Sequence, residues 1–234
     1  MTRPLEKPLF VNCVFDSVEG EVAHLGQGVF TTFIRLQGCN LRCSYCDTQY
    51  SQELPGSGKE PVIIRDLIRQ IRTKKVTITG GEPLMQENVF DLIQILLKKG
   101  HIVTVETNGT IKPPQIYGDK DLGYIFDYKL PSSGMEEAMM PLEDFSDAMN
   151  DNSILKFVIS NDVDFNRAEE VVCSQNKFME HYRCAFSPAL GKGAELTPAQ
   201  LVDRMRLEDL YFIRFNLQIH KFIWPNAQEE GIEV

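Results

Sequence analysis

The chain has 234 residues, a length that fits one large domain or two small ones. Its 33 acidic and 24 basic side chains leave a formal net charge of −9, which argues against non-specific binding to nucleic acid. No apolar run is long enough to cross a membrane and no signal peptide is recognisable, so we expect a cytoplasmic protein that binds neither nucleic acid nor membrane.

Short β-branched runs alternate along the chain with segments of helical periodicity. Strands are predicted at Phe10–Asp16, Thr31–Leu36, Val76–Thr79, Ile102–Glu106, Tyr124–Tyr128, Ile154–Ile159, Arg183–Phe186 and Phe212–Ile219. Most of these runs are almost continuously apolar, which indicates strands buried on both faces of a sheet.

Four amphipathic helices are predicted between these strands, and two of them carry clear end signals. The helices are expected at Pro61–Arg72, Gln86–Lys99, Asp164–Phe178 and Pro198–Leu207. Gly100 should end the second and Thr197 should cap the fourth. Alternating strands and helices predict a parallel sheet with right-handed crossovers. Because a complete eight-fold barrel takes about 250 residues, about six core strands predict an α/β fold with a partial, open β/α barrel, formed as a single domain over residues 1–234.

Three of the six cysteines lie close together, in a loop over residues 38–48 that follows the strand Thr31–Leu36. Cys39, Cys43 and Cys46 can converge on one metal centre if this loop wraps around it. A structural zinc site needs four ligands, and no fourth Cys or His lies at a natural spacing, although a zinc site completed from elsewhere is the alternative. A [4Fe–4S] cluster held by three cysteines leaves one iron open for catalysis. The other cysteines are expected to be small buried hydrophobic side chains: Cys13, Cys173 and Cys184.

A second motif, Thr79-Gly80-Gly81-Glu82-Pro83, follows the predicted strand Val76–Thr79. Two glycines let the backbone approach a ligand closely, and the Glu82 carboxylate can accept hydrogen bonds from a positively charged amino group. Together, this segment and the cysteine spacing, with Tyr45 before the last cysteine, resemble the radical S-adenosylmethionine (SAM) superfamily.

Further segments are similar to the 7-carboxy-7-deazaguanine synthase family, in a match that extends from residue 17 to residue 224. These segments are residues 17–21, 33–36, 46–48, 106–110, 129–134 and 218–224. Members of that family contract 6-carboxy-5,6,7,8-tetrahydropterin to 7-carboxy-7-deazaguanine with loss of ammonia, a step toward queuosine and other 7-deazapurines. The resemblance implies this activity and a reduced partial barrel.

The resemblance also implies roles for individual residues. Cys39, Cys43 and Cys46 would hold the [4Fe–4S] cluster, and the Thr48 hydroxyl would bind a Mg²⁺ ion. Contacts with SAM are implied for Tyr45, Cys46, Asp47, Gly81, Glu82, Glu106, Asn108 and Lys129, of which the last three are otherwise ordinary polar loop residues. Contacts with the carboxypterin are implied for Val18, Glu19, Gly20, Arg35 and Thr79. A homodimer and a flavodoxin- or ferredoxin-like electron donor are expected as well.

Arg35 supports a carboxylate substrate on independent grounds. It lies in a strongly apolar strand, where alternation places Phe33 and Arg35 on one side and Ile34 and Leu36 on the other. An arginine inside a barrel is costly unless it is paired, and a substrate carboxylate would pair with it through two parallel hydrogen bonds. The alternative is a structural salt bridge with an acid from another strand.

The chain departs from the family pattern at two places, and two other functions are alternatives. Glu19 replaces the usual Gln, and Asp127-Tyr128-Lys129 replaces the Ser-Pro-Lys of many members. One other function is a glycyl-radical-enzyme activase of the same superfamily. The second is a non-catalytic iron–sulfur or zinc protein, for which the Gly-Gly-Glu segment would serve no purpose.

Overall fold

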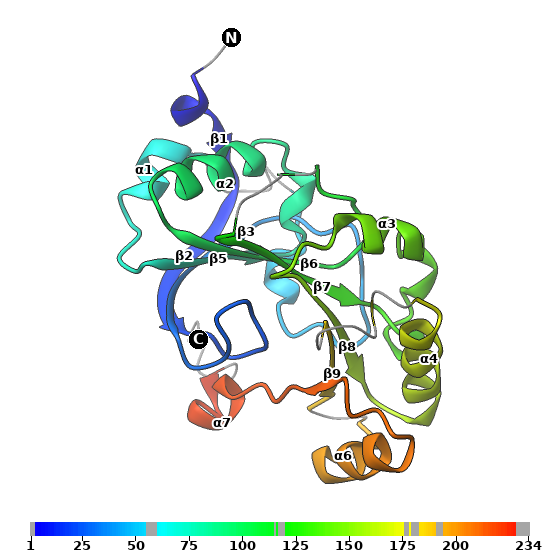
Figure 1. The fold of residues 1–234 in the computed structure, drawn as a ribbon. Helices are drawn as coiled ribbons and strands as arrows, with labels where there is room; N and C mark the ends of the chain where they lie inside the picture. Colours follow the sequence, from blue (N-terminus) through cyan, green and yellow to red (C-terminus); the bar gives the residue numbers. More distant parts are fainter. Residues whose placement is uncertain are drawn as a thin grey trace.

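The computed structural model describes residues 3–54, 60–114, 116, 120–175, 178, 183–190 and 194–227. One curved sheet has the strand order β10-β9-β8-β7-β6-β5-β3-β2 (Figure 1). Its strands are β2 (Val11–Val18), β3 (Phe30–Leu36), β5 (Lys75–Gly80), β6 (Ile102–Thr107), β7 (Leu122–Tyr128), β8 (Ile154–Ile159), β9 (Cys184–Pro188) and β10 (Arg214–Phe215). Neighbours from β3 to β10 are parallel, whereas β2 is antiparallel to β3. The predicted mainly parallel sheet is therefore confirmed, with an antiparallel edge strand added.

The helices connect these strands. They are α1 (Ile64–Ile68), α2 (Val89–Lys98), α3 (Leu142–Ala148), α4 (Asp162–Cys173), α6 (Pro198–Leu207) and α7 (His220–Ile223), and β1 (Pro8–Leu9) pairs with β4 (Val62–Ile63) in a separate two-stranded sheet. Figure 1 shows α1 to α4 along the outside of the curved sheet. In contrast, α7 lies beside the loop between β2 and β3, where the Ile219 amide donates to the Gly20 carbonyl. None of the helices in the described ranges has the length and apolar character of a membrane span.

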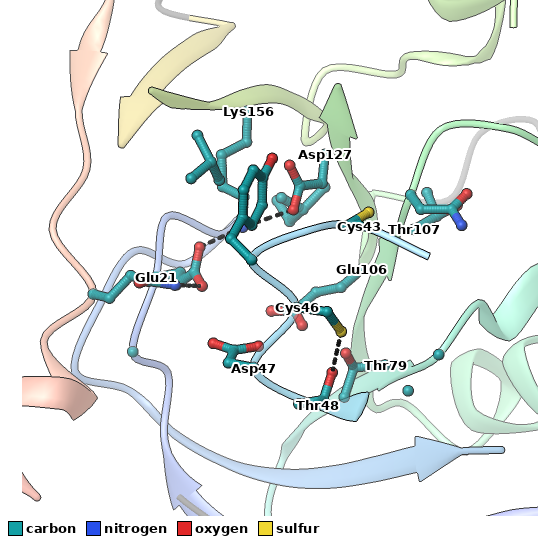
Figure 2. A pocket seen from close by; sticks show the side chains of 18 of the residues that line it. Glu21, Cys43, Cys46, Asp47, Thr48, Thr79, Glu106, Thr107, Asp127 and Lys156 are labelled. Atoms are coloured by element: carbon teal, nitrogen blue, oxygen red, sulfur yellow. Dashed lines mark hydrogen bonds and ion pairs between the residues drawn. The ribbon is translucent and has the colours of Figure 1, made fainter. Parts of the chain in front are cut away.

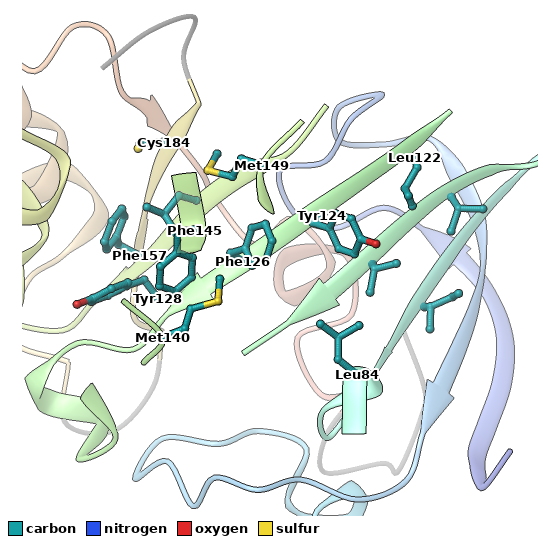
Figure 3. Close-up of a cluster of buried hydrophobic side chains, with 14 of the residues drawn as sticks. Leu84, Leu122, Tyr124, Phe126, Tyr128, Met140, Phe145, Met149, Phe157 and Cys184 are labelled. Atoms are coloured by element: carbon teal, nitrogen blue, oxygen red, sulfur yellow. The ribbon is translucent and has the colours of Figure 1, made fainter. Parts of the chain in front are cut away.

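Strand alternation gives the sheet an apolar outer face and a polar inner face. In β7, Tyr124, Phe126 and Tyr128 point outward into the hydrophobic core, and Asp127 points inward to a cavity (Figures 2 and 3). The Phe126 ring meets Phe145 of α3 edge-on, with 5.6 Å between centroids. Truncation of a fully buried ring costs ~3–5 kcal/mol, so the packing of the outer face contributes strongly to the stability of the fold. The polar side chains of the inner face are then available for chemistry.

Two of the four predicted helices end where their end signals place them. A left-handed Gly100, with φ of +81°, follows α2, and Thr197 caps α6 by accepting a hydrogen bond from the Gln200 amide. The helix predicted at Asp164–Phe178 begins two residues earlier, because the Asn161 side chain caps it, and it ends at Cys173. Residues 176–177 of that prediction lie outside the described residues.

Two other predicted elements differ from the structure. The helix predicted at Pro61–Arg72 is shortened to α1, because residues 62–63 pair with β1. The strand predicted at Phe212–Ile219 is wrong beyond the two residues of β10. Its polar side chains bond to another part of the chain instead: Asn216 accepts from the Val22 amide, and Gln218 donates to Glu21.

Candidate active site

A cavity of about 250 Å³ opens on the inner face of the sheet, near the carboxyl ends of the parallel strands. It is lined by every predicted site residue except Glu82, namely Val18, Glu19, Gly20, Arg35, Cys39, Cys43, Tyr45, Cys46, Asp47, Thr48, Thr79, Gly81, Glu106, Asn108 and Lys129. The fold thus brings together residues that are up to 111 positions apart in the sequence, from Val18 to Lys129.

The loop over residues 38–48 forms one wall of this cavity. Its start is joined to the turn that follows the loop, where the Gly38 amide donates to the Ser51 carbonyl at 2.8 Å. Its centre is attached to the turn after β7, because the Ser44 amide and hydroxyl donate to the carbonyls of Ser133 and Ser132. Figure 2 shows Cys43 and Cys46 on this loop, and Cys46 Sγ lies 3.8 Å from Thr48 Oγ1.

The three thiols suit a cluster with one cysteine on each of three irons. Cys39, Cys43 and Cys46 all face the cavity. In the described part of the chain no three His, Cys, Asp or Glu side chains converge on a single ion, whereas a cluster needs its thiolates spread over separate irons. Burial raises the pKa of the Cys39 and Cys43 thiols. The positive charge of bound iron would offset this effect, because thiolates are the ligating form.

The glycine pair after β5 permits a very close backbone contact with the cysteine loop. A Cβ atom on Gly81 would lie 2.2 Å from the Gly38 carbonyl oxygen and 2.8 Å from the Cys39 Cβ. A Cβ on Gly80 would lie 2.2 Å from the Leu36 carbonyl oxygen, and its φ of +147° also favours glycine. The two glycines therefore seat the end of β5 directly against the start of the cysteine loop.

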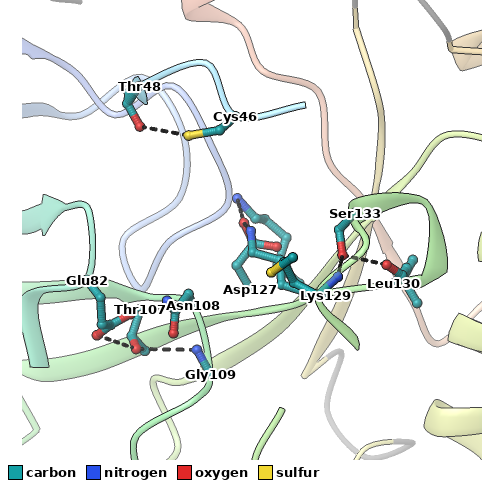
Figure 4. Close-up of polar contacts among 12 residues, drawn as sticks. Cys46, Thr48, Glu82, Thr107, Asn108, Gly109, Asp127, Lys129, Leu130 and Ser133 are labelled. Atoms are coloured by element: carbon teal, nitrogen blue, oxygen red, sulfur yellow. Dashed lines mark hydrogen bonds and ion pairs between the residues drawn. The ribbon is translucent and has the colours of Figure 1, made fainter. Parts of the chain in front are cut away.

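Glu82 has a different environment from the one expected from the sequence. Its side chain is fully buried, and its carboxylate accepts hydrogen bonds from the Leu84 amide at 2.9 Å, the Thr107 hydroxyl at 2.9 Å and the Asn108 amide at 2.6 Å (Figure 4). These donors lie after β5 and at the end of β6. In this structure the carboxylate joins two strand ends and does not face the cavity.

We expect Glu82→Gln to lower the free energy of unfolding by ~1–3 kcal/mol, because the amide NH₂ would face one of two buried N–H donors. For a chain of this size the melting temperature should fall by roughly 2–4 °C for each kcal/mol. Anaerobic thermal unfolding measures the change, with Glu87→Gln at an exposed position as the matched control. An unchanged melting temperature would contradict this role for Glu82.

The same variant has an expected pH signature. Burial raises the pKa of Glu82 to about 7, although its three hydrogen-bond donors act in the opposite direction and lower this pKa. The folded state therefore holds this proton more tightly than the unfolded chain, whose carboxyl has an ordinary pKa of about 4.5. The contribution of this bound proton to the stability of wild type is complete below pH 4.5 and is lost as the pH rises through 7. Glu82→Gln has no such proton, so the difference in free energy of unfolding between wild type and Glu82→Gln should shrink as the pH rises from 4.5 through 7.

Asn108 connects the end of β6 to the cysteine loop. Its side-chain amide donates to Asn40 Oδ1 at 2.9 Å and lies 3.8 Å from Cys39 Sγ, while its carbonyl oxygen accepts from the Thr110 amide and hydroxyl. These contacts fix the amide beside one of the three thiols.

Arg35 and Thr79 lie side by side on the inner face, as register partners of β3 and β5. The guanidinium carbon is 5.7 Å from the centroid of the Phe15 ring and 5.9 Å from that of Tyr50. Stacking on aromatic rings offsets part of the cost of removing this charge from water. The planar group is therefore held at the cavity wall in a fixed orientation.

The Glu19 side chain already has strong partners inside the protein. Its carboxylate forms a fully buried ion pair with Lys75 and accepts a hydrogen bond from the Thr77 hydroxyl at 2.9 Å. At the next position, a Cβ on Gly20 would lie 2.0 Å from Nδ1 of His220. This segment consequently presents mainly backbone to the cavity.

Glu106 is an acid in the cavity wall whose pKa is displaced from its ordinary value. Burial and the like charges of Glu19 and Glu21 raise the pKa of Glu106 to about 7, against the opposing charge of Lys156. A carboxyl group with a pKa near the working pH can both accept and donate a proton.

Several lining residues were missed by the sequence analysis: Glu21, Asp127, Lys156, Gln218, His220 and Lys221. Asp127 and Lys156 had a usable signal, because each is a charged residue within an apolar strand at an inward position. Gln218 was assigned to a strand that does not form, and His220 and Lys221 follow that strand; the resemblance over residues 218–224 marked all three without implying a role for them.

Comparison with known proteins agrees with this geometry. The radical SAM superfamily profile matches residues 33–168, which include the cysteine loop and the Gly-Gly-Glu segment. The crystal structure of QueE from Escherichia coli has a TM-score of 0.69 with this chain, at 22% sequence identity over 90% of this chain and 94% of that one. That likeness shows a shared fold.

Two relatives match along most of their length. The 7-carboxy-7-deazaguanine synthase of Clostridium acetobutylicum is 33% identical over 225 residues, which cover 93% of this chain and 96% of that protein. The 7-carboxy-7-deazaguanine synthase of Methanospirillum hungatei is 35% identical over 214 residues, covering 90% and 83%. The chain therefore belongs to the radical SAM superfamily and, within it, to the family of 7-carboxy-7-deazaguanine synthases.

Proposed function

We propose that this protein contracts 6-carboxy-5,6,7,8-tetrahydropterin to 7-carboxy-7-deazaguanine and releases ammonia, in the biosynthesis of queuosine-type 7-deazapurines. The observation that carries the proposal is that three cysteine thiols and Arg35 line the same cavity. The thiols suit the [4Fe–4S] cluster of a radical SAM enzyme, and the guanidinium suits the carboxylate of the substrate.

The chain's part in this reaction is to bind and orient the cofactors and the substrate, and to exclude water from the cavity. When bound, the cluster and SAM supply a 5′-deoxyadenosyl radical by one-electron cleavage of SAM. Cys39, Cys43 and Cys46 would hold the cluster. Arg35 would orient the pterin through two parallel hydrogen bonds to its carboxylate.

The remaining site assignments belong to this proposal. SAM contacts are proposed for Tyr45, Cys46, Asp47, Gly81, Glu82, Glu106, Asn108 and Lys129. For Glu82 the contact would come from the backbone, because its carboxylate accepts three internal hydrogen bonds. Substrate contacts are proposed for Val18, Glu19, Gly20, Arg35 and Thr79.

The decisive experiment is anaerobic reconstitution with iron and sulfide, followed by incubation with SAM, a reductant and the carboxypterin. We expect 7-carboxy-7-deazaguanine and ammonia in equal amounts, detected by mass spectrometry and an ammonia assay. A protein that cleaves SAM but leaves the carboxypterin intact would contradict the proposal. A glycyl radical formed on a second protein would favour the activase instead.

Thr48 is the proposed protein ligand of Mg²⁺, which prefers oxygen ligands and keeps several waters. We expect Thr48→Ala to weaken the stimulation of turnover by Mg²⁺ only moderately, because water can replace the lost hydroxyl. The iron content should not change, and Thr48→Ser should restore the response. A Mg²⁺ titration of turnover makes the comparison, and an unaltered response in Thr48→Ala would exclude this residue from the metal site.

Three further features belong to this proposal, the last two of them from the resemblance to the family. The protein would act as a single domain and assemble as a homodimer. It would receive its electron from a flavodoxin- or ferredoxin-like protein. Size-exclusion chromatography with light scattering tests the dimer, and turnover with purified flavodoxin in place of a chemical reductant tests the donor.

A further inference from the structure

Four charged side chains of alternating sign form a row along one wall of the cavity. Lys156 Nζ lies 2.5 Å from Glu21 Oε2 and 3.5 Å from Asp127 Oδ2 (Figure 2). Asp127 Oδ2 in turn lies 2.9 Å from Lys129 Nζ (Figure 4). We call the side chains of Glu21, Lys156, Asp127 and Lys129 the charge row.

The centre of the row is built into the sheet. Asp127 and Lys156 are register partners of the parallel strands β7 and β8, and both point to the inner face. Lys156 is only 8% exposed, and a buried ammonium is costly unless it is paired. Burial lowers the pKa of Lys156, but the charges of Asp127, Glu21 and Glu106 raise it well above its ordinary value. Lys156 is therefore a fixed cation between two carboxylates.

The row includes a departure from the family pattern. Asp127 stands where many members have Ser, and its carboxylate supplies the charge that the lysine on the next strand requires. With Ser at this position, Glu21 would be the one carboxylate left within 4 Å of Lys156 Nζ in the described part of the chain.

One end of the row holds the C-terminal segment against the cavity. Gln218 Nε2 donates to Glu21 Oε1 at 2.6 Å, and the Asn216 amide lies 3.5 Å from Glu21 Oε2. Residues 216–221, which we call the covering segment, include His220 and Lys221 in the cavity wall. Lys221 reaches the cysteine loop as well, with its Nζ 3.2 Å from Asp47 Oδ2.

The other end of the row lies beside the cysteine loop. Lys129 Nζ is 5.9 Å from the centroid of the Tyr45 ring, which belongs to that loop. The row thus extends from the covering segment to the loop that carries the cluster cysteines.

We propose that Lys156 is a positioning residue: held in place by Asp127, it fixes the Glu21 carboxylate so that Glu21 seats the covering segment over the bound substrate. This inference rests on the proposed function for the identity of that substrate. Lys156 acts through Glu21, so its loss should impair substrate binding more than the chemical step.

The first experiment compares Lys156→Met, Lys156→Arg and wild type as reconstituted enzymes. We expect Lys156→Met to raise the KM for the carboxypterin at least tenfold while kcat changes less than threefold, and Lys156→Arg to restore KM to within threefold of wild type. Lys112→Met is the matched control, because Lys112 pairs with two acids on the exposed surface. A fall in kcat with unchanged KM, or no rescue by arginine, would overturn the proposal.

The second experiment needs no turnover. Trypsin cleaves after Lys221, and cleavage there requires the covering segment to leave its place. We expect faster release of the fragment that begins at Phe222 from Lys156→Met than from wild type and Lys112→Met. If the protein proves inactive on the carboxypterin but still shows this difference, the proposed function fails and the seating role stands. Equal cleavage rates would overturn the seating role itself.

A third variant covers the case in which Lys156→Met does not fold, since a buried unpaired Glu21 would remain. The double variant Glu21→Gln/Lys156→Met removes both charges. If Lys156 acts through Glu21, its KM and cleavage rate should match those of Glu21→Gln alone, because effects of residues in one chain of contacts are not additive. Additive effects would show that Lys156 acts independently and would overturn the proposal.

Discussion

Replacing any one of Cys39, Cys43 or Cys46 with alanine should abolish SAM cleavage and prevent assembly of a cluster with about four irons. Each of the three thiols faces the cavity. A cluster held by three thiolates has one iron without a protein ligand, and removal of one cysteine would leave a second iron without one. Iron analysis, the visible absorption of the cluster and an assay for 5′-deoxyadenosine measure the loss. The effect should be complete, because no other cysteine lines the cavity within the described residues.

The remaining cysteines are the matched controls. The expectation that these side chains are buried is confirmed for Cys184 in β9, where burial raises the pKa of its thiol. It is wrong for Cys173, which is exposed at the end of α4, and Cys13 on β2 is only half-buried. Alanine at each of these positions should leave the iron content and SAM cleavage intact. A requirement for any of them in cluster assembly would contradict a site with one open iron.

The second large effect is expected at Arg35. Arg35→Lys should raise the KM for the carboxypterin roughly 10- to 150-fold. This fold-change corresponds to ~1.5–3 kcal/mol, the free energy of one lost charge-assisted hydrogen bond. A lysine keeps the charge but cannot form two parallel hydrogen bonds with a carboxylate. Steady-state kinetics with varied carboxypterin measure the change.

The controls for this prediction separate binding from stability. SAM binding should be nearly unchanged in Arg35→Lys, and Arg72→Lys, on the exposed surface, should have no effect on KM. If Arg35→Lys instead binds substrate normally and melts at a lower temperature, Arg35 has a structural role.

The sequence predicts this site best where its chemistry is local. The three cysteines lie within eight residues, so their spacing points to a cluster loop. The glycine pair was expected to let the backbone approach a ligand, and the close approach that the structure shows is to the cysteine loop itself. Arg35 was placed on the same strand side as Phe33 by alternation, and both side chains line the cavity. In each case the relevant geometry is set within one strand or one loop.

Features that depend on the approach of distant segments were not predictable in the same way. The sequence places Glu82 beside the glycine pair but does not reveal that its carboxylate meets the end of β6, 25 residues later. The pairing of Asp127 with Lys156 requires the register between two strands. The C-terminal run resembles a strand because of its apolar residues, whereas Asn216 and Gln218 make side-chain contacts nearly 200 positions away.

The opposite faces of β7 have a consequence for insertions and deletions in this family. Phe126 and Tyr128 belong to the hydrophobic core, while Asp127 lies between them and faces the cavity. One residue inserted or deleted inside the strand would exchange the two faces, placing a carboxylate in the core and aromatic rings in the cavity. Length changes should therefore be tolerated after the strand ends but not within the strands, because a single shift would disrupt folding and catalysis together.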